Sequence, residues 1–142
     1  MLSATSDYAL RAVLLLARSR DDRPMRADEI ADATGAPRNY LAKTLNAMAK
    51  AGIVTSARGP QGGFMLAVAP AALPIARIVD LFEEPRPRGT CLLGARPCNP
   101  LRPCAAHCRW TAVTDARREP LMTTTVADLL ADDIPRDDVA AA

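Results

Sequence analysis

The chain has 142 residues, enough to bury a sizeable core in one domain, so disulfide bonds are not required for a stable fold. Its net charge of +2 excludes no class of partner by itself, and no apolar run approaches the roughly 20 residues that cross a bilayer. The apolar segment from Ala9 to Ala17 contains Arg11 and lacks a cleavage-site pattern, which excludes a typical signal peptide. We therefore expect a cytoplasmic protein with reduced cysteines, which are better suited to bind metal than to form disulfides.

Three helices are predicted in the first part of the chain. Apolar residues at helical spacing predict the first over residues 6–18, with Ser6 or Thr5 as its N-cap. The second covers residues 27–33 and is closed by Gly35. The third has Pro37 in its first turn, where the missing N–H is tolerated, and ends at Gly52. The residues expected to point inward from the third helix are Tyr40, Leu41, Leu45 and Met48.

A glycine-rich hairpin follows these helices. Residues 53–56 and 64–68 have the composition and alternation of strands, and the turn between them reads Arg58-Gly59-Pro60-Gln61-Gly62-Gly63. Two short helices, a longer helix and a glycine-rich hairpin predict a mainly α fold with a small β-wing, the winged helix-turn-helix.

The second half of the chain predicts two further helices around an irregular segment. Residues 74–82 form a fourth helix, and prolines and glycines then forbid regular structure as far as Cys104. Residues 105–119 are expected to be helical, and Thr123, Thr124 or Thr125 could cap a last helix over residues 126–131. The expected organisation is a DNA-binding domain over 1–83, a cysteine-rich cluster-binding loop over 84–104, a C-terminal dimerisation helix and short terminal helix over 105–131, and a flexible tail over 132–142.

The charge distribution points to nucleic acid. No Asp or Glu occurs between Ala33 and Val79, while several basic residues do. In a helix-turn-helix the N-terminal residues of the second helix reach base edges, so Arg38 is expected on guanine and Asn39 on adenine. The alternative is an ordinary helical hairpin with solvated basic residues. The residues expected to contact DNA are Arg38, Asn39, Tyr40, Lys43, Lys50, Arg58, Gly59 and Gln61, with Lys43 and Lys50 on phosphates and Arg58 in a minor groove.

Four cysteines follow residue 90 with wide, uneven spacing. Six, five and three residues separate Cys91, Cys98, Cys104 and Cys108 in turn, and none of these intervals is the Cys-x-x-Cys of a zinc ribbon. Thiolates on an open loop suit an iron–sulfur cluster, with a fourth position open to imidazole or carboxylate. A structural zinc on three cysteines and His107 is one alternative, and a disulfide switch through Cys91 or Cys98 is another. An enzyme is not expected, because His107 is the only histidine and no acid, base or nucleophile constellation surrounds it.

Taken together, these segments resemble the family of small dimeric winged-helix repressors that includes NsrR, IscR and RirA. The resemblance extends from Leu2 to Leu130 and is carried by the order and spacing of several segments. These are Asp7-Tyr8-Ala9-Leu10-Arg11, Pro37-Arg38-Asn39-Tyr40-Leu41, the wing turn, three cysteines and a Thr-Val-Ala-Asp-Leu ending.

The resemblance implies a homodimer that binds a partly palindromic DNA operator, with an iron–sulfur cluster near the subunit boundary. The Pro-Arg-Asn opening is closer to the nitric-oxide-sensing NsrR-like branch, and Ala42 stands where the IscR pattern has a glutamate. Relatives in that branch complete the cluster site with a first-helix aspartate of the partner chain, which corresponds to Asp7. The implied ligands are Cys91, Cys98, Cys104 and Asp7, with His107 and Cys108 as alternatives to Asp7, and we favour a 4Fe–4S over a 2Fe–2S cluster.

Two features depart from the family pattern. Cys108 is an additional thiol, and Pro120 falls within the stretch that forms a long pairing helix in the family. Because an interior proline costs about 3 kcal/mol through a lost hydrogen bond and a clash, we expect the helix to break or kink near Arg118.

Overall fold

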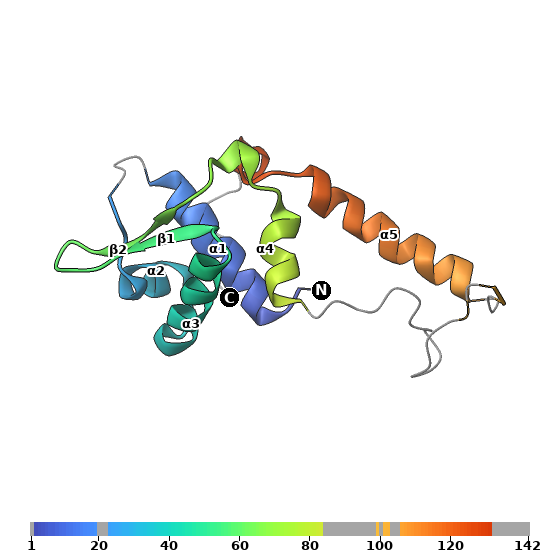
Figure 1. Ribbon diagram of the computed structural model, residues 1–142, viewed down its shortest axis with the longest axis horizontal. Coiled ribbons are helices and arrows are strands. Elements are labelled where there is room, and N and C mark those ends of the chain that lie inside the picture. Colours follow the sequence, from blue (N-terminus) through green and yellow to red (C-terminus); the bar gives the residue numbers. More distant parts are fainter. Residues whose placement is uncertain (1, 20–22, 84–98, 100, 103–105, 132–142) are drawn as a thin grey trace.

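The computed structural model describes residues 2–19, 23–83, 99, 101–102 and 106–131. Within these ranges a helical body carries a two-stranded wing on one side and a long projecting helix on the other (Figure 1). No helix in these ranges is long and apolar enough to cross a membrane. The helices are α1 (Ala4–Arg18), α2 (Ala27–Thr34), α3 (Arg38–Lys50), α4 (Ile75–Phe82), α5 (His107–Thr123) and α6 (Val126–Ala131), with a short 3-10 turn at Pro70–Ala72.

Helix α1 is the centre of the core and packs against α2, α3, α4 and α6. It begins two residues earlier than the sequence predicts because Ser3 is its N-cap, with Ser3 Oγ accepting from Ser6 N at 3.2 Å. The expected caps Ser6 and Thr5 are therefore wrong, and Ser6 is buried instead. The fully buried side chains of the core include Val13, Ile30, Leu41, Leu45, Met48, Ile53, Leu73, Ile78 and Val126.

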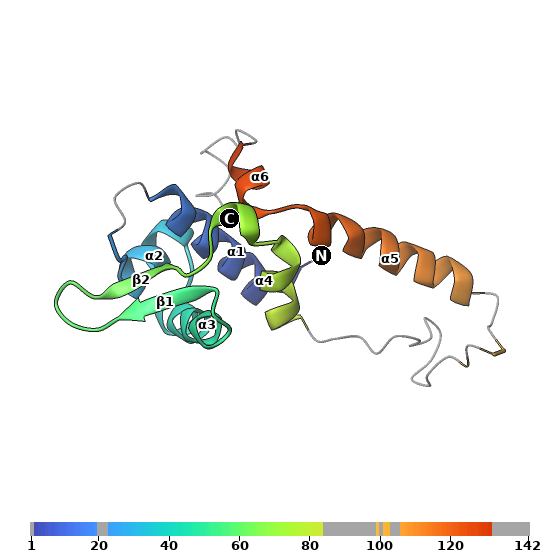
Figure 2. The ribbon, with the colours of Figure 1, turned by 45° about the horizontal axis from the view of Figure 1, so that its top comes forward.

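The wing is an antiparallel hairpin of β1 (Val54–Ala57) and β2 (Gly63–Leu66), with Val54 opposite Leu66 and Ala57 opposite Gly63. The expected hairpin is thus confirmed, with strand ends shifted by one or two residues. Figure 2 shows it projecting from the helical body beside α2 and α3.

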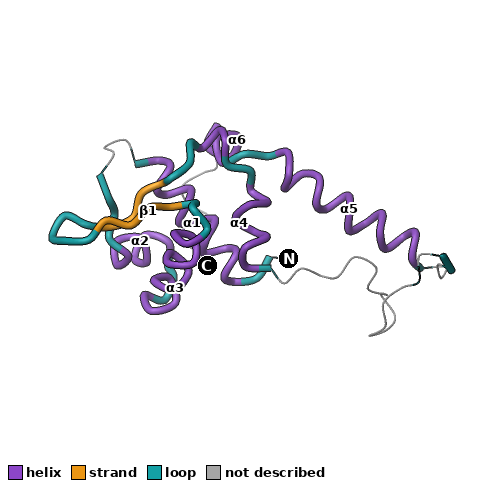
Figure 3. Tube along the Cα trace, viewed as in Figure 1, coloured by secondary structure: helices purple, strands orange, loops and turns teal. Residues whose placement is uncertain are grey.

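Helix α5 leaves the body at its C-terminal end and extends away from it (Figure 3). The break expected near Arg118 is wrong, since α5 continues through Pro120 to Thr123. Pro120 stands in the last turn and has no N–H to donate to the Ala116 carbonyl, while its own carbonyl accepts from Thr124 N at 3.0 Å. Arg118 forms an ion pair with Asp80 of α4 at 2.9 Å, which helps to hold the helix against the body.

Candidate nucleic-acid interface

The turn between α2 and α3 has the geometry of a helix-turn-helix. Gly35 ends α2 with a φ of 69°, a left-handed conformation that residues with a side chain adopt at a cost. Ala36 is buried, and Pro37 then caps α3, its carbonyl accepting from Leu41 N at 2.9 Å. Expected to lie in the first turn, Pro37 instead stands one position before it.

Helix α3 has one buried and one exposed face. Leu41, Leu45 and Met48 are fully buried, which confirms their predicted inward position. The opposite side exposes polar residues at helical spacing, namely Asn39, Lys43, Asn46 and Lys50. Asn46 was not predicted as a contact, although its place three residues after Lys43 could have revealed it. This row of amides and amines can bind phosphates and base edges.

Tyr40 is neither inward nor aligned with this row. Its side chain is 39% exposed, so the predicted burial is wrong. Its hydroxyl is hydrogen-bonded to the Thr5 hydroxyl, and its ring meets the Tyr8 ring edge-on with centroids 6.0 Å apart. Tyr40 thus connects the first turn of α3 to the first turns of α1.

Arg38 forms an ion pair with the neighbouring Asp32. Its Nη2 lies 2.9 Å from Asp32 Oδ2 and its Nε lies 3.3 Å from Asp32 Oδ1, a two-pronged pair between α3 and the end of α2. Both side chains are mostly exposed, and so the pair can open.

Backbone contacts fix the wing beside α2. Met25 N donates to Phe64 O at 3.0 Å, and Phe64 N donates to Met25 O at 2.7 Å. A Cβ built at Gly63 would lie 2.5 Å from Met25 O, so only glycine permits this approach. At Gly62 a Cβ would lie 2.3 Å from Ala57 O. The glycines of the turn therefore set the wing's attachment and closure.

One basic residue outside the predicted set braces the tip of the wing. Arg26 Nη2 donates to Pro60 O at 2.5 Å, while Arg26 N donates to Glu29 Oε2 at 2.9 Å. Arg58, Gly59 and Gln61 beside this contact are exposed, as a surface for DNA requires. Nothing in the sequence pairs Arg26 with Pro60, because the contact spans 34 positions.

Arg77 lies in the stretch between Ala33 and Val79 that has no Asp or Glu, and its side chain stabilises the fold. Its Nη2 donates to Ala51 O at 3.2 Å, at the C-terminal end of α3. A cation there offsets the negative end of the helix dipole and satisfies a terminal carbonyl.

The end of α4 is joined to the beginning of α1 by Glu83. Its Oε1 accepts from Ser6 Oγ at 2.5 Å and from Ser3 N at 2.9 Å. These bonds, that from Ser6 above all, hold the pKa of the Glu83 carboxyl below its ordinary value, because they favour the charged form. Glu83, which directly precedes the cysteine segment (residues 84–104), is thus anchored to α1. Helix α1 in turn contacts α3, the recognition helix, through Thr5 and Tyr8.

Replacing Glu83 with glutamine should lower the free energy of unfolding by about 1 kcal/mol at neutral pH, since a charge-assisted bond is weakened. A depressed folded pKa contributes stability above the ordinary glutamate pKa of about 4.3, and that stability is lost as pH falls through the folded value. Thermal melts from pH 7 to pH 3 should therefore show the difference between parent and Glu83→Gln shrinking in acid. Glu119→Gln, at an exposed position of α5, is the control. A difference between parent and Glu83→Gln that does not change with pH would contradict the assignment.

The candidate metal ligands are only partly described. Cys91, Cys98 and Cys104 lie outside the described residues, and within those residues no three of His, Cys, Asp and Glu gather into a metal site. His107 and the exposed Cys108 open α5, and Asp7 lies in the first turn of α1, paired with Arg11 at 3.0 Å. Figures 1 and 2 show the beginning of α5 at the far end of the molecule from α1, so one chain does not bring Asp7 to His107.

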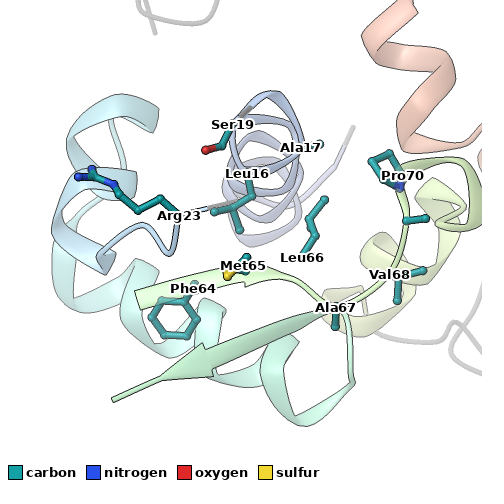
Figure 4. Close-up of a pocket in the computed structure, with 11 residues that line it drawn as sticks. Leu16, Ala17, Ser19, Arg23, Phe64, Met65, Leu66, Ala67, Val68 and Pro70 are labelled. Atoms are coloured by element: carbon teal, nitrogen blue, oxygen red, sulfur yellow. The ribbon is translucent and has the colours of Figure 1, made fainter. Parts of the chain in front are cut away.

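A cavity of about 270 Å³ opens between the end of α1 and β2. Figure 4 shows apolar side chains on both walls, including Leu16 from α1 and Leu66 from β2, with Arg23 at one end. Arg23 lies 3.5 Å from Glu29, so its charge is already partnered. None of the cavity's lining residues belongs to α3 or α5, and it is not part of the candidate interface.

The geometry defines a winged helix-turn-helix protein of the DNA-binding class. A profile of the Rrf2 family, described as an iron-dependent transcriptional regulator, matches residues 2–132. An HTH-type transcriptional regulator of Aquifex aeolicus is 36% identical over 132 residues, covering 92% of this chain and 91% of that protein. The chain belongs to the Rrf2 family of transcriptional regulators, which are not enzymes.

Solved structures agree with this assignment. CymR, the global cysteine regulator of B. subtilis, superimposes with a TM-score of 0.76 at 27% identity and covers 92% of this chain and 96% of its own. IscR of T. potens gives a TM-score of 0.74 at 27% identity, covering 93% of this chain and 87% of its own. The predicted family and fold class are confirmed, whereas the NsrR-like branch stays a prediction.

Proposed function

We propose that this regulator is a repressor whose operator affinity is controlled by an iron–sulfur cluster that responds to nitric oxide, redox state or iron supply. The observation that carries the proposal is the connection through Glu83. This residue directly precedes the cysteine segment and is hydrogen-bonded to the start of α1, which in turn touches Tyr40 of the recognition helix. A change in the cysteine segment can therefore reach α3 through packed residues. We place the protein in the cytoplasm, with its DNA.

The DNA-contacting surface in this proposal is the exposed row of α3 together with the wing tip. Arg38 and Asn39 read bases, Lys43 and Lys50 bind phosphates, and Arg58 enters a minor groove beside Gly59 and Gln61. Exposure of all these residues supports the assignment. Tyr40 acts on DNA only indirectly, by holding α3 against α1.

Arg58→Ala is expected to weaken operator binding by about 1–3 kcal/mol, because a side chain within a groove loses its contacts. Lys50→Ala should weaken binding to operator and random DNA alike. It should also reduce the dependence of affinity on salt concentration, as loss of one phosphate contact does. Fluorescence-anisotropy titrations at several salt concentrations measure both effects. The assignment of Arg58 fails if its variant loses affinity equally on operator and random duplex.

A homodimer is proposed from the exposure of α5. All the side chains that the structure describes from Cys108 to Pro120 are exposed, including Val113 at 53%. The helix has 17 residues, hence a length of about 25 Å, and most of the stability of a helix in a protein comes from the packing of its faces. A second copy that covers α5 would bury Val113 and place two recognition helices for a two-part operator.

The cluster ligands proposed are Cys91, Cys98 and Cys104, with Asp7 of the partner chain as the fourth. Three thiolates and one carboxylate are a donor set that an iron–sulfur cluster accepts. Arg11 engages Asp7 Oδ2, yet the Asp7 side chain remains 45% exposed and accessible to another chain. A bound cluster, with 4Fe–4S favoured, would supply a centre reactive toward nitric oxide and oxidants.

The fourth ligand is tested by anaerobic reconstitution of Asp7→Ala, His107→Ala and Cys108→Ala. Asp7→Ala should shift the cluster's absorbance spectrum and shorten its lifetime, because the weak carboxylate ligand is lost, while the other two variants should match the parent. If Asp7→Ala is unchanged and His107→Ala alters both properties, the imidazole completes the site.

A cluster-free thiol switch, or a zinc-stabilised protein, is the second candidate. The likeness to CymR and the exposed Cys108 favour a thiol-based function. Iron and acid-labile sulfide in anaerobically purified protein would support the cluster, whereas zinc alone or no metal would support this alternative.

A further inference from the structure

We propose that Asp32 is a specificity-determining residue, which holds Arg38 in a two-pronged ion pair until a guanine replaces it. The inference rests on the proposed role of Arg38 as a base reader. It assigns to the exposed acid of α2 a part in rejecting DNA that lacks the correct base.

The ion pair between Asp32 and Arg38 has two prongs. Asp32 Oδ1 and Oδ2 accept from Nε and Nη2 of Arg38 at 3.3 and 2.9 Å, with a further contact of 3.1 Å from Nη2 to Oδ1. Guanine offers O6 and N7 to the same guanidinium fork in the major groove. The carboxylate therefore occupies the donors of Arg38 in the way that the cognate base would.

Asp32 is poorly placed to stabilise its own helix. It lies in the last turn of α2, where the negative end of the helix dipole disfavours an acid. Its side chain is 63% exposed and makes no contribution to the core. The acids in the first turn of the same helix, Asp28 and Glu29, have the favourable position instead.

The consequence is a penalty that depends on sequence. In the major groove adenine and thymine each offer Arg38 one acceptor and cytosine offers none, so binding at a wrong base exchanges two good contacts for one or none. A guanine restores both contacts, and the penalty is largely cancelled. Because the pair is exposed, the effect should be modest, about two- to five-fold in affinity for random DNA.

The test compares binding to two duplexes of equal length, one selected by the parent protein from a random pool and one of random sequence. Anaerobic anisotropy titrations at one salt concentration are run on the parent, Asp32→Asn, Arg38→Ala and the double variant. Asp32→Asn should bind random DNA about two- to five-fold more tightly with a smaller change on the selected duplex, so the specificity ratio falls. Asp32→Glu should restore the ratio.

Asp28→Asn is the matched control, because it removes the same charge from an exposed position of the same helix. It should strengthen binding to both duplexes equally, as loss of a nearby negative charge does. In the Arg38→Ala background, Asp32→Asn should change the affinity for the two duplexes no more than Asp28→Asn does. If Asp32→Asn behaves like Asp28→Asn in the parent while Arg38→Ala lowers the ratio, the role of Asp32 is overturned and that of Arg38 stands. If Arg38→Ala leaves the ratio unchanged, the base-reading proposal itself fails.

Discussion

Val113→Asp is expected to convert the proposed homodimer into monomers and to lower operator affinity by about 100-fold or more. Two linked half-site contacts gain about 10²–10⁴ in avidity over one. In a dimer paired through α5, each of the two helices would bury one aspartate, and these two carboxylates would lose water and repel each other. Within a single chain the change should be mild, since Val113 is 53% exposed and the two residues have similar helix propensities. Sedimentation velocity and operator titration measure the two effects.

Val113→Ala is the matched control for this prediction. It removes part of the apolar side chain without adding a charge, so dimers should persist at a somewhat weaker association constant. Circular dichroism should show the same helix content in both variants. A Val113→Asp protein that sediments as a dimer and binds the operator normally would exclude this face of α5 from the subunit interface.

The sequence predicts the DNA-binding half well because its signals are local. Gly35 and Pro37 mark the turn between α2 and α3, and the glycines after Arg58 mark the wing. Helical spacing correctly identifies Leu41, Leu45 and Met48 as core. Each of these inferences depends on residues close together in the chain.

The errors arise where distant residues decide the outcome. Ser6 resembles a cap, but the carboxylate of Glu83 binds it across 77 positions and Ser3 takes the cap. Tyr40 occupies an apparently inward position and contacts Thr5 on α1 instead. Pro120 resembles a helix breaker, yet α5 continues through it, and the Arg118–Asp80 ion pair that holds this end of the helix spans 38 positions. Pairing of Asp32 with Arg38 and of Arg26 with Pro60 likewise has no signal in the sequence.

We propose above all that the cluster controls DNA affinity. The expected ratio of the operator affinities with and without the cluster follows from the usual strength of coupling between two sites. Two sites that bias one two-state element usually change each other's affinity by about 5–150-fold. The contacts available for this purpose run from Glu83 through Ser3 and Ser6 to α1, and from Thr5 and Tyr8 to Tyr40. They join Glu83, the residue before the cysteine segment, to the first turn of the recognition helix α3.

The most direct test is an anaerobic titration of one selected operator duplex with the same protein preparation before and after removal of iron and sulfide, at fixed salt and protein concentration. Iron and acid-labile sulfide assays establish the loading of each sample, and sedimentation confirms that both are dimers. We predict that the two forms differ in operator affinity by about 5–150-fold, with little difference on random DNA. Superimposable binding curves for the loaded and the cluster-free dimer would contradict the claim, and any bound cluster would then have a structural role.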